Sequence, residues 1–125
     1  MTDKGYGIPA LRDVYLEGSW VLGFTIRPDS FTMRVEFVLL PTHPAYRKPQ
    51  HGEMYSYRRG DLSFEHFATF EWKPAGFRPA TDAKGEVDYG SIDLLQADHE
   101  VVQIEGDFGV IRVMGGSVAM NLLGP

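Results

Sequence analysis

The sequence contains no cysteine among its 125 residues. Without thiols the chain can form no disulfide, thiolate metal site, iron–sulfur cluster or cysteine nucleophile. No apolar run approaches the roughly 18 residues of a membrane-spanning helix, and the start MTDKGYGIPAL lacks the apolar segment of an export signal. We therefore expect a cytoplasmic protein that does not engage a membrane and whose stability comes from packing.

Basic residues are also scarce, with 12 Lys and Arg against 17 Asp and Glu and a net charge of -5. Because binding to phosphates needs a concentrated basic surface, a nucleic-acid role is not expected. The imbalance is concentrated in residues 80–125, which hold two Lys/Arg against eight Asp/Glu. This half is either a solvated acidic surface or a docking surface for a basic protein partner.

Aromatic residues are plentiful, and apolar residues alternate with polar ones in a period of two. Residues 20–27 and 31–39 follow this pattern on either side of Pro28-Asp29-Ser30, which predicts an antiparallel hairpin. The parity of these and later strands predicts one buried face. Its expected core residues are Trp20, Leu22, Phe24, Met33, Val35, Phe37, Phe64, Phe70, Ile104, Ile111 and Val113.

Further strands are predicted on both sides of the glycine- and proline-rich segments. A turn at Arg59-Gly60-Asp61 is expected to form a second hairpin. Phe67 breaks the alternation, which predicts either a bulge near residues 65–68 or a strand that is apolar on both faces there. Residues 91–97, with Ser91 as the N-cap, are the one segment that favours a short helix. The remaining strands are expected at residues 14–16, 53–59, 62–72, 101–105, 110–114 and 117–122.

These elements predict an all-β fold: a single antiparallel meander of about seven to eight strands that forms a small barrel or a sandwich. The chain is one domain's length, so we expect residues 1–125 to form a single domain, with residues 1–12 as a loose N-terminal segment. A sheet edge of such a fold could also join two copies into a homo-oligomer.

Histidine and carboxylate residues around the proline-rich loop offer one candidate site. His43, His51 and Glu53 are a plausible ligand set for a divalent metal. The run from Glu53 to Gly60 resembles the second half of the first cupin motif, but the two histidines that precede the glutamate in that motif are missing. His66 shares the parity of neighbouring aromatic residues and is expected to be hydrogen-bonded in the core or at a sheet edge.

A second candidate is the acidic segment Asp82, Glu86, Asp88 and Asp93. Its carboxylates are calcium-type ligands without EF-hand spacing, and aspartates also cap turns through bonds to the backbone. No serine stands in a nucleophile motif, and no glycine-rich loop precedes a helix. The sequence therefore favours a non-enzymatic protein without a cofactor.

Four phrases that together span most of the chain are His43-Pro44-x-Tyr46, Glu53-x-Tyr55-x-Tyr57-Arg58-x-Gly60, Asp82 through Asp88-Tyr89-Gly90-x-Ile92-Asp93, and Glu105-Gly106-Asp107-Phe108-Gly109. Together they resemble a family of small uncharacterised bacterial all-β domains, some of which are grouped with immunity proteins of contact-dependent toxin systems. The resemblance implies a bacterial cytoplasmic protein that binds another protein.

Taken together, the sequence predicts a binding domain that docks a basic protein partner through the acidic segment. Tyr46 and Arg58 are expected near that segment and near His43, because the long loops of small β-domains often gather at one end. The alternative is a metal-binding or cupin-like enzyme that uses His43, His51 and Glu53.

Overall fold

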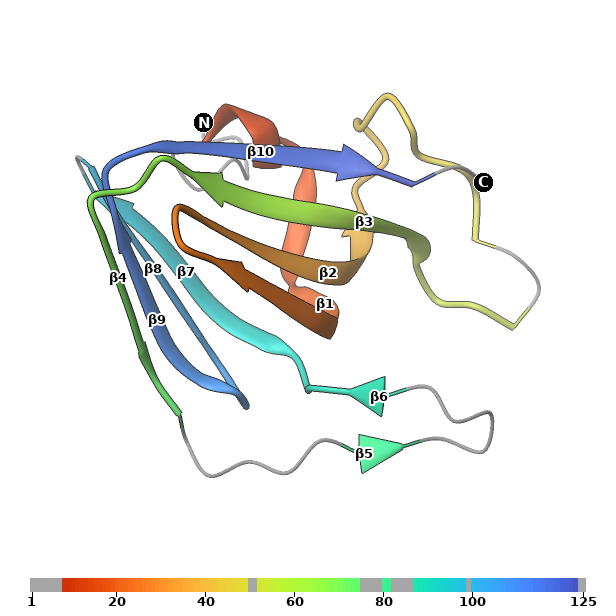
Figure 1. The fold of residues 1–125 in the computed structure, drawn as a ribbon. Helices are drawn as coiled ribbons and strands as arrows, with labels where there is room; N and C mark the ends of the chain where they lie inside the picture. The colour runs from red at the N-terminus through yellow and green to blue at the C-terminus, as the bar shows by residue number, and fades with distance from the viewer. Residues whose placement is uncertain (1–7, 50–51, 75–79, 82–86, 99, 124–125) are drawn as a thin grey trace.

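The computed structural model describes residues 8–49, 52–74, 80–81, 87–98 and 100–123 (Figure 1). A single 3-10 turn, η1 (Pro9–Leu11), precedes the first strand, and no helix in the described part of the chain could cross a membrane. Ten strands follow: β1 (Val14–Arg27), β2 (Ser30–Leu39), β3 (Ser56–Glu65), β4 (Thr69–Lys73), β5 (Ala80–Thr81), β6 (Val87–Asp88), β7 (Ile92–Asp98), β8 (Val101–Gly106), β9 (Gly109–Met114) and β10 (Ser117–Leu122).

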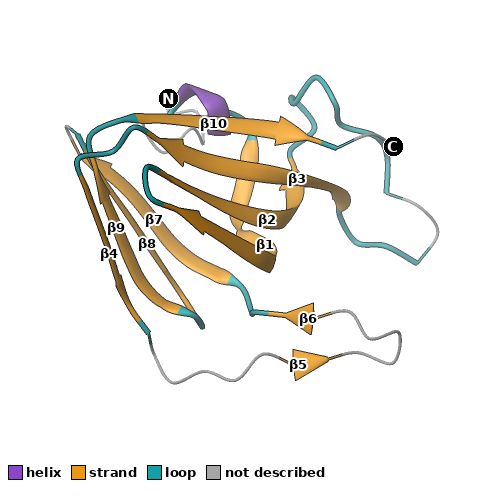
Figure 2. Ribbon diagram, in the orientation of Figure 1, coloured by secondary structure: helices purple, strands orange, loops and turns teal. Residues whose placement is uncertain are grey.

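The strands form two four-stranded antiparallel sheets and one small ribbon (Figure 2). Sheet A has the order β1-β2-β3-β10, sheet B has the order β4-β9-β8-β7, and β5 pairs with β6. The all-β prediction is confirmed. Of the two arrangements that the sequence left open, the described strands adopt the sandwich and do not close into a barrel.

The chain passes between the sheets at one shared corner. Sheet A ends where Glu65 pairs with Ser117, and sheet B begins where Thr69 pairs with Met114. Residues 66–68 and residues 115–116 therefore connect the two sheets. The single strand expected over residues 62–72 is instead two strands, β3 and β4, in different sheets. This corner takes two paired strands from one sheet into the next. Only Gly115 and Gly116 separate β9 from β10, yet these strands lie in different sheets.

His66 lies at this corner and is exposed, with a positive φ of 59°. Its expected place in the core or at a sheet edge, inferred from strand parity, is wrong because the strand has already ended at Glu65.

The turn expected at Gly60 is also absent, because β3 runs straight through it. The glycine is needed for close packing instead. A Cβ on Gly60 would lie 2.6 Å from the carbonyl oxygen of Asn121 in the neighbouring strand β10. A glycine within a strand can thus mark a close approach of two backbones as well as a turn.

The segment predicted to be a short helix is the strand β7. Its two buried residues, Ile92 and Leu95, are three positions apart, as on one face of a helix. The spacing arises from an irregularity in the pairing with β8 between Ile92 and Leu94. A bulge shifts side-chain parity by one residue, and sequence alone does not distinguish this pattern from a helical turn.

The core lies between the two sheets and η1 adds Leu11 to it. Aromatic contacts join the sheets, with ring centroids 4.7 Å apart for Phe24 and Trp72 and 4.8 Å apart for Phe31 and Phe70. Burial is confirmed for Met33, Val35, Phe37, Phe64, Ile104, Ile111 and Val113, with Phe24 and Phe70 partly buried against them.

The core prediction fails at the start of the first hairpin. Trp20 is 42% exposed and Leu22 is only partly buried, whereas Val21 between them is fully buried. The pairing of β1 with β2 shifts register between Tyr15 and Trp20 and again between Val21 and Gly23. The first shift reverses which residues face the core, and the second returns Phe24 to it.

Candidate functional site

The outer face of sheet A, which points away from sheet B, carries the most distinctive surface of the described chain. The register places Tyr15, Val38 and Tyr57 in one row across β1, β2 and β3. The next row along the strands begins with Trp20 opposite Glu36. Because paired residues share a face, Trp20 and the tyrosines belong to one continuous surface.

We call Tyr15, Trp20, Met54, Tyr55 and Tyr57 the aromatic patch. Tyr55 contacts Tyr15 and Tyr57 edge to face, with ring centroids 6.4 Å and 6.2 Å apart. Met54 directly precedes Tyr55 in the chain and is 78% exposed. The patch therefore combines large apolar side chains with polar hydroxyl and indole groups on an open surface.

Local sequence explains how Tyr15 joins the patch. Its ring lies over Gly18, where a Cβ would be only 3.0 Å from the ring carbons. Val38, in the same row, is 1% exposed although it does not belong to the core cluster. The tyrosines of its row therefore cover Val38 on the outer face.

Trp20 also borders the acidic segment. It forms an isolated antiparallel bridge with Ser91, and Val21 donates a backbone hydrogen bond of 2.9 Å to the carbonyl of Gly90. The Ser91 hydroxyl lies 3.3 Å from a carboxylate oxygen of Asp93, and its backbone N–H donates to Asp107 at 3.2 Å. Two exposed carboxylates thus meet at the residue that pairs with Trp20.

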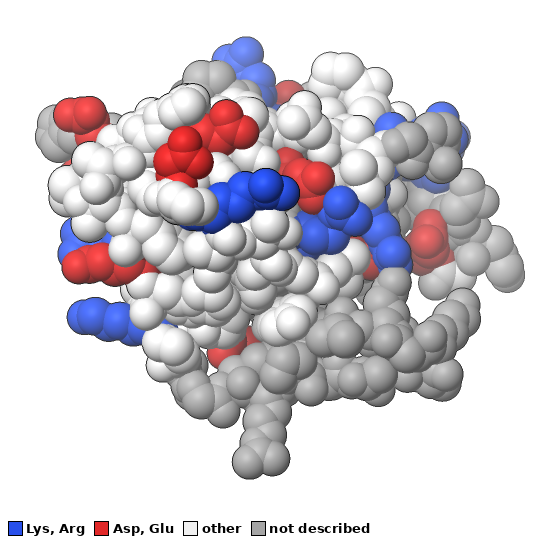
Figure 3. All heavy atoms as spheres, viewed as in Figure 1, with Lys and Arg blue, Asp and Glu red and all other residues white. Residues whose placement is uncertain are grey.

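Beyond the aromatic patch the outer face is charged. Arg34 donates to Asp61 from Nε at 2.6 Å and from Nη2 at 3.4 Å, and this hydrogen bonding raises the pKa of Arg34. Arg59 and Glu36 approach less closely, at 3.9 Å. Figure 3 shows Lys and Arg atoms gathered in the middle of this face with Asp and Glu beside them.

An open hollow of about 520 Å³ lies next to these charges. It forms where the register of β1 and β2 shifts between Val21 and Gly23, and where Gly23 has no side chain opposite Arg34. We call it the arginine hollow. Its polar lining is Thr25, Arg27, Thr32, Arg34 and Asp61.

The acidic segment predicted from the sequence is described only in part. Asp82 and Glu86 lie outside the described residues, and Asp88 is in β6, where its backbone pairs with Ala80. Asp93 is exposed in β7. The structure therefore links Asp93 to Trp20 through Ser91, which bridges to Trp20 and bonds the Asp93 carboxylate, a connection that the sequence did not suggest.

Tyr46, Arg58 and His43 do gather at one place. The Tyr46 backbone N–H donates to the carbonyl of His43 at 3.0 Å, and the Arg58 Nε donates to the carbonyl of Leu123 at 2.9 Å. Arg58 is close enough to His43 to contribute to lowering its pKa. Tyr46 packs against the core. The three residues therefore connect the loop between β2 and β3 to Leu123, the residue that follows β10.

The proposed metal ligands are only partly described. The His43 Nδ1 accepts a hydrogen bond of 3.0 Å from the Ala45 backbone, and burial is the main cause that lowers the pKa of His43. His51 lies outside the described residues, and Glu53 is exposed. Within the described ranges, no three His, Asp or Glu side chains form a group that could hold a metal ion.

Sequence reasoning missed Trp20 as a surface residue. The available signal was Gly18-Ser19, which interrupts the alternation between the strand signals at 14–16 and 20–26. The structure fuses both into β1, and the Ser19 hydroxyl donates to the Tyr15 carbonyl and accepts from the Val38 N–H. A small polar pair between two apolar runs can therefore indicate a bulge as well as a turn.

Of the expectations that came from the family resemblance, the structure confirms only that the chain is a small all-β protein. No family model, no curated protein and no solved structure matches this chain.

Proposed function

We propose that this protein is a non-enzymatic binding domain that docks a basic protein partner, with Trp20 at the centre of the contact. The aromatic patch supplies the apolar part of the surface, and the acidic segment that ends at Asp93 supplies the charge. The observation that carries the proposal is the backbone bridge between the exposed Trp20 and Ser91, whose hydroxyl and backbone N–H bond the carboxylates of Asp93 and Asp107.

The composition of the patch supports a protein partner. Tyrosine, tryptophan, methionine and arginine are enriched at protein interfaces, and tryptophan and tyrosine are frequent hot spots of binding energy. Such side chains are rigid, so ordering them on binding costs little conformational entropy. Four of the five patch residues are aromatic, and the fifth, Met54, is the most exposed large apolar side chain of the described chain.

The charge supports a basic partner. A lysine or arginine side chain can stack on an indole ring while its charged end meets a carboxylate. Asp93 and Asp107 lie where such a charged end would reach, and the eight acidic residues of residues 80–125 would attract it from a distance. The resemblance to immunity-related domains suggests a toxin as the partner, and we include this in the proposal.

Site-specific photo-crosslinking in the source cell tests the proposal. A photoreactive residue at Met54 would report the aromatic patch, and one at Met114 would report sheet B. Met114, at the end of β9, is a matched control because it is also a methionine with an exposed side chain. Its exposed fraction is 44%, and that of Met54, which precedes β3, is 78%.

We expect one basic protein to be crosslinked from position 54 and not from position 114. Equal labelling from both positions, or labelling from position 114 alone, would contradict the assignment of the aromatic patch. An acidic crosslinked protein would contradict the role of the acidic segment.

A further inference from the structure

The arginine hollow lies at the opposite end of the outer face from Tyr15 and Tyr55, and the proposed protein contact does not use it. We propose that the arginine hollow binds a phosphate-type oxyanion, either free or as the phosphate group of a small molecule. The inference rests on two guanidinium groups and two hydroxyls that line one open cavity of about 520 Å³.

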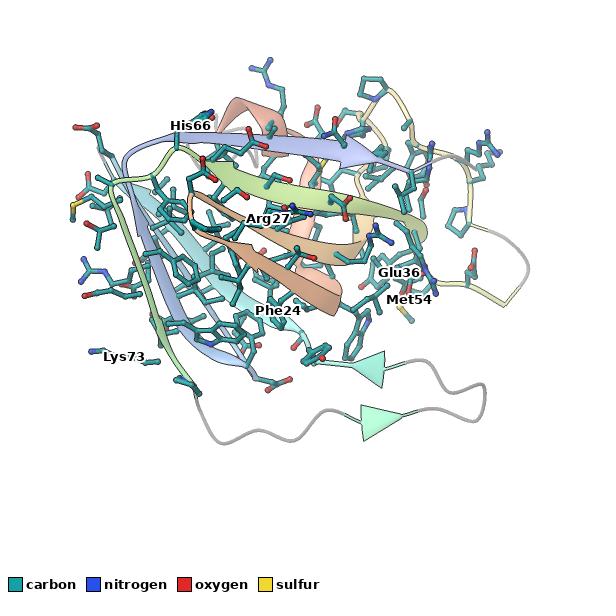
Figure 4. The ribbon with its side chains drawn as sticks, viewed as in Figure 1. Phe24, Arg27, Glu36, Met54, His66 and Lys73 are labelled. Carbon is teal, nitrogen blue, oxygen red and sulfur yellow. The ribbon has the colours of Figure 1, made fainter. Side chains whose placement is uncertain are left out.

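Arg27 is the group that an anion would engage first. It ends β1, is exposed and makes no ion pair with any residue in the described ranges. Figure 4 shows Arg27 and Phe24 on opposite sides of β1, with Phe24 toward the core. Its guanidinium is therefore a charged donor group on the outer face without a described counter-ion.

Arg34 is held in place by its neighbour. Asp61 accepts from its Nε and one Nη, which fixes the planar guanidinium and leaves the remaining N–H donors open. Asp61 also lines the hollow, but Arg34 offsets its charge. Arg27 then remains as the uncompensated charge of the cavity.

The hydroxyl groups complete the donor set. Thr25 pairs with Thr32 across β1 and β2, so both side chains lie on the same face. The Thr32 hydroxyl is 3.2 Å from that of Ser63, and either one can be the donor. If Ser63 donates, the Thr32 proton is free for a ligand in the hollow.

This arrangement suits phosphate better than a carboxylate. The donors come from two strands and from four side chains, so a ligand with three or four acceptor oxygens can engage more of them than one with two. Phosphate carries about 1.5 to 2 negative charges at pH 7. It can meet the unpaired charge of Arg27 and also accept hydrogen bonds from the N–H donors of Arg34 that Asp61 does not use. The hollow is of the size that small-molecule sites have, about 300 to 1,000 Å³.

The test is a titration of the full chain with inorganic phosphate, followed by amide chemical shifts at constant ionic strength. We expect saturable shifts at Gly23, Thr25 and Thr32. Arg27→Gln should weaken binding by about tenfold, the effect of losing one charge-assisted hydrogen bond. Gly23→Val should also weaken binding by filling the hollow, in which the atom nearest to a Cβ at this position is the Arg34 Cβ, at 4.0 Å.

Arg112→Gln is the matched control, because it removes one exposed arginine from sheet B. It should leave the affinity for phosphate unchanged. Equal weakening by Arg27→Gln and Arg112→Gln, or shifts that do not saturate, would overturn the proposal. Either result would mean that phosphate is attracted by positive charge in general and not by this hollow. Acetate that binds as tightly as phosphate would overturn the phosphate assignment. If Gly23→Val does not weaken phosphate binding, phosphate is an adventitious ion only, and the proposal is overturned.

Discussion

Trp20 in β1 pairs with Ser91, so an exposed tryptophan from sheet A lies beside the residue that precedes β7, the edge strand of sheet B. The bridge is flanked by two hydrogen bonds of 2.9 Å between Val21 and its partners Tyr89 and Gly90. It joins the sheets along the side opposite the bent corner. The same contact that closes the sandwich therefore also brings the acidic segment to the aromatic patch.

The core assignment predicts the cost of removing Phe37, which is fully buried between the sheets. We expect Phe37→Ala to lower the free energy of unfolding by about 3 to 5 kcal/mol, the usual cost of deleting a buried aromatic ring. Urea denaturation measures this change. Trp20→Ala is the control and should cost less than Phe37→Ala, since the indole is 42% exposed. A loss for Phe37→Ala below about 1 kcal/mol would contradict its burial.

The corner between the sheets predicts a strong requirement for glycine at position 116. Gly116 has a φ of 84°, and a Cβ there would lie 2.9 Å from the backbone nitrogen of Phe67 and collide with the Glu65 carbonyl. Gly116→Ala should therefore cost about 2 kcal/mol or more, from conformational strain and steric overlap together.

Gly52 separates these two effects. Its φ is 89°, but nothing lies within 4 Å of a Cβ placed there. Gly52→Ala should cost only the strain, about 1 kcal/mol. Thermal unfolding of both variants gives the comparison, and equal losses would show that the corner is not tightly packed.

Much of the fold could be predicted because alternation reports strands directly. The hairpin of β1 and β2 and the last three strands appear near their expected residues. The errors occur where a bulge shifts parity by one residue. Trp20 was predicted to be buried and β7 to be helical for this single reason, since a bulge depends on pairing with a distant strand. The aromatic patch was hidden for the same reason, because Trp20 and Tyr57 share one surface only through the register of β1, β2 and β3.

Protonation of His43 should destabilise the fold. Burial lowers the pKa of His43 below its ordinary value, and its Nδ1 accepts a hydrogen bond from Ala45 that protonation would break. The unfolded chain therefore binds the proton more tightly. The contribution of His43 is complete above a pH of about 6.5 and is lost as the pH falls through the lowered folded value.

Urea denaturation between pH 7.5 and 5 measures this slope. His43→Asn can keep an acceptor for the Ala45 N–H and should reduce the loss of stability on acidification. His66→Asn, at the exposed corner, should follow the unmodified protein. An identical slope for all three proteins would show that His43 does not contribute.

The acidic segment should control the rate of association with a basic partner. Changing Asp82, Glu86 and Asp88 together to their amides should slow association about tenfold and leave folding nearly intact, within the usual range of electrostatic steering. The rate for the unmodified protein should also fall as salt shortens the Debye length from about 10 Å at 0.1 M to about 3 Å at 1 M. Stopped-flow mixing measures both, and a rate indifferent to salt and to the substitutions would contradict steering.

We propose that the surface around Trp20 is where this protein binds its partner. The most direct measurement is the equilibrium affinity of the crosslinked partner, once purified, for the unmodified protein, for Trp20→Ala and for Met114→Ala, each checked for folding. We predict that Trp20→Ala weakens binding by about 30-fold or more, as for a hot-spot residue that contributes about 2 kcal/mol, while Met114→Ala changes it less than about twofold. An unchanged affinity for Trp20→Ala, or a loss confined to Met114→Ala, would contradict the claim.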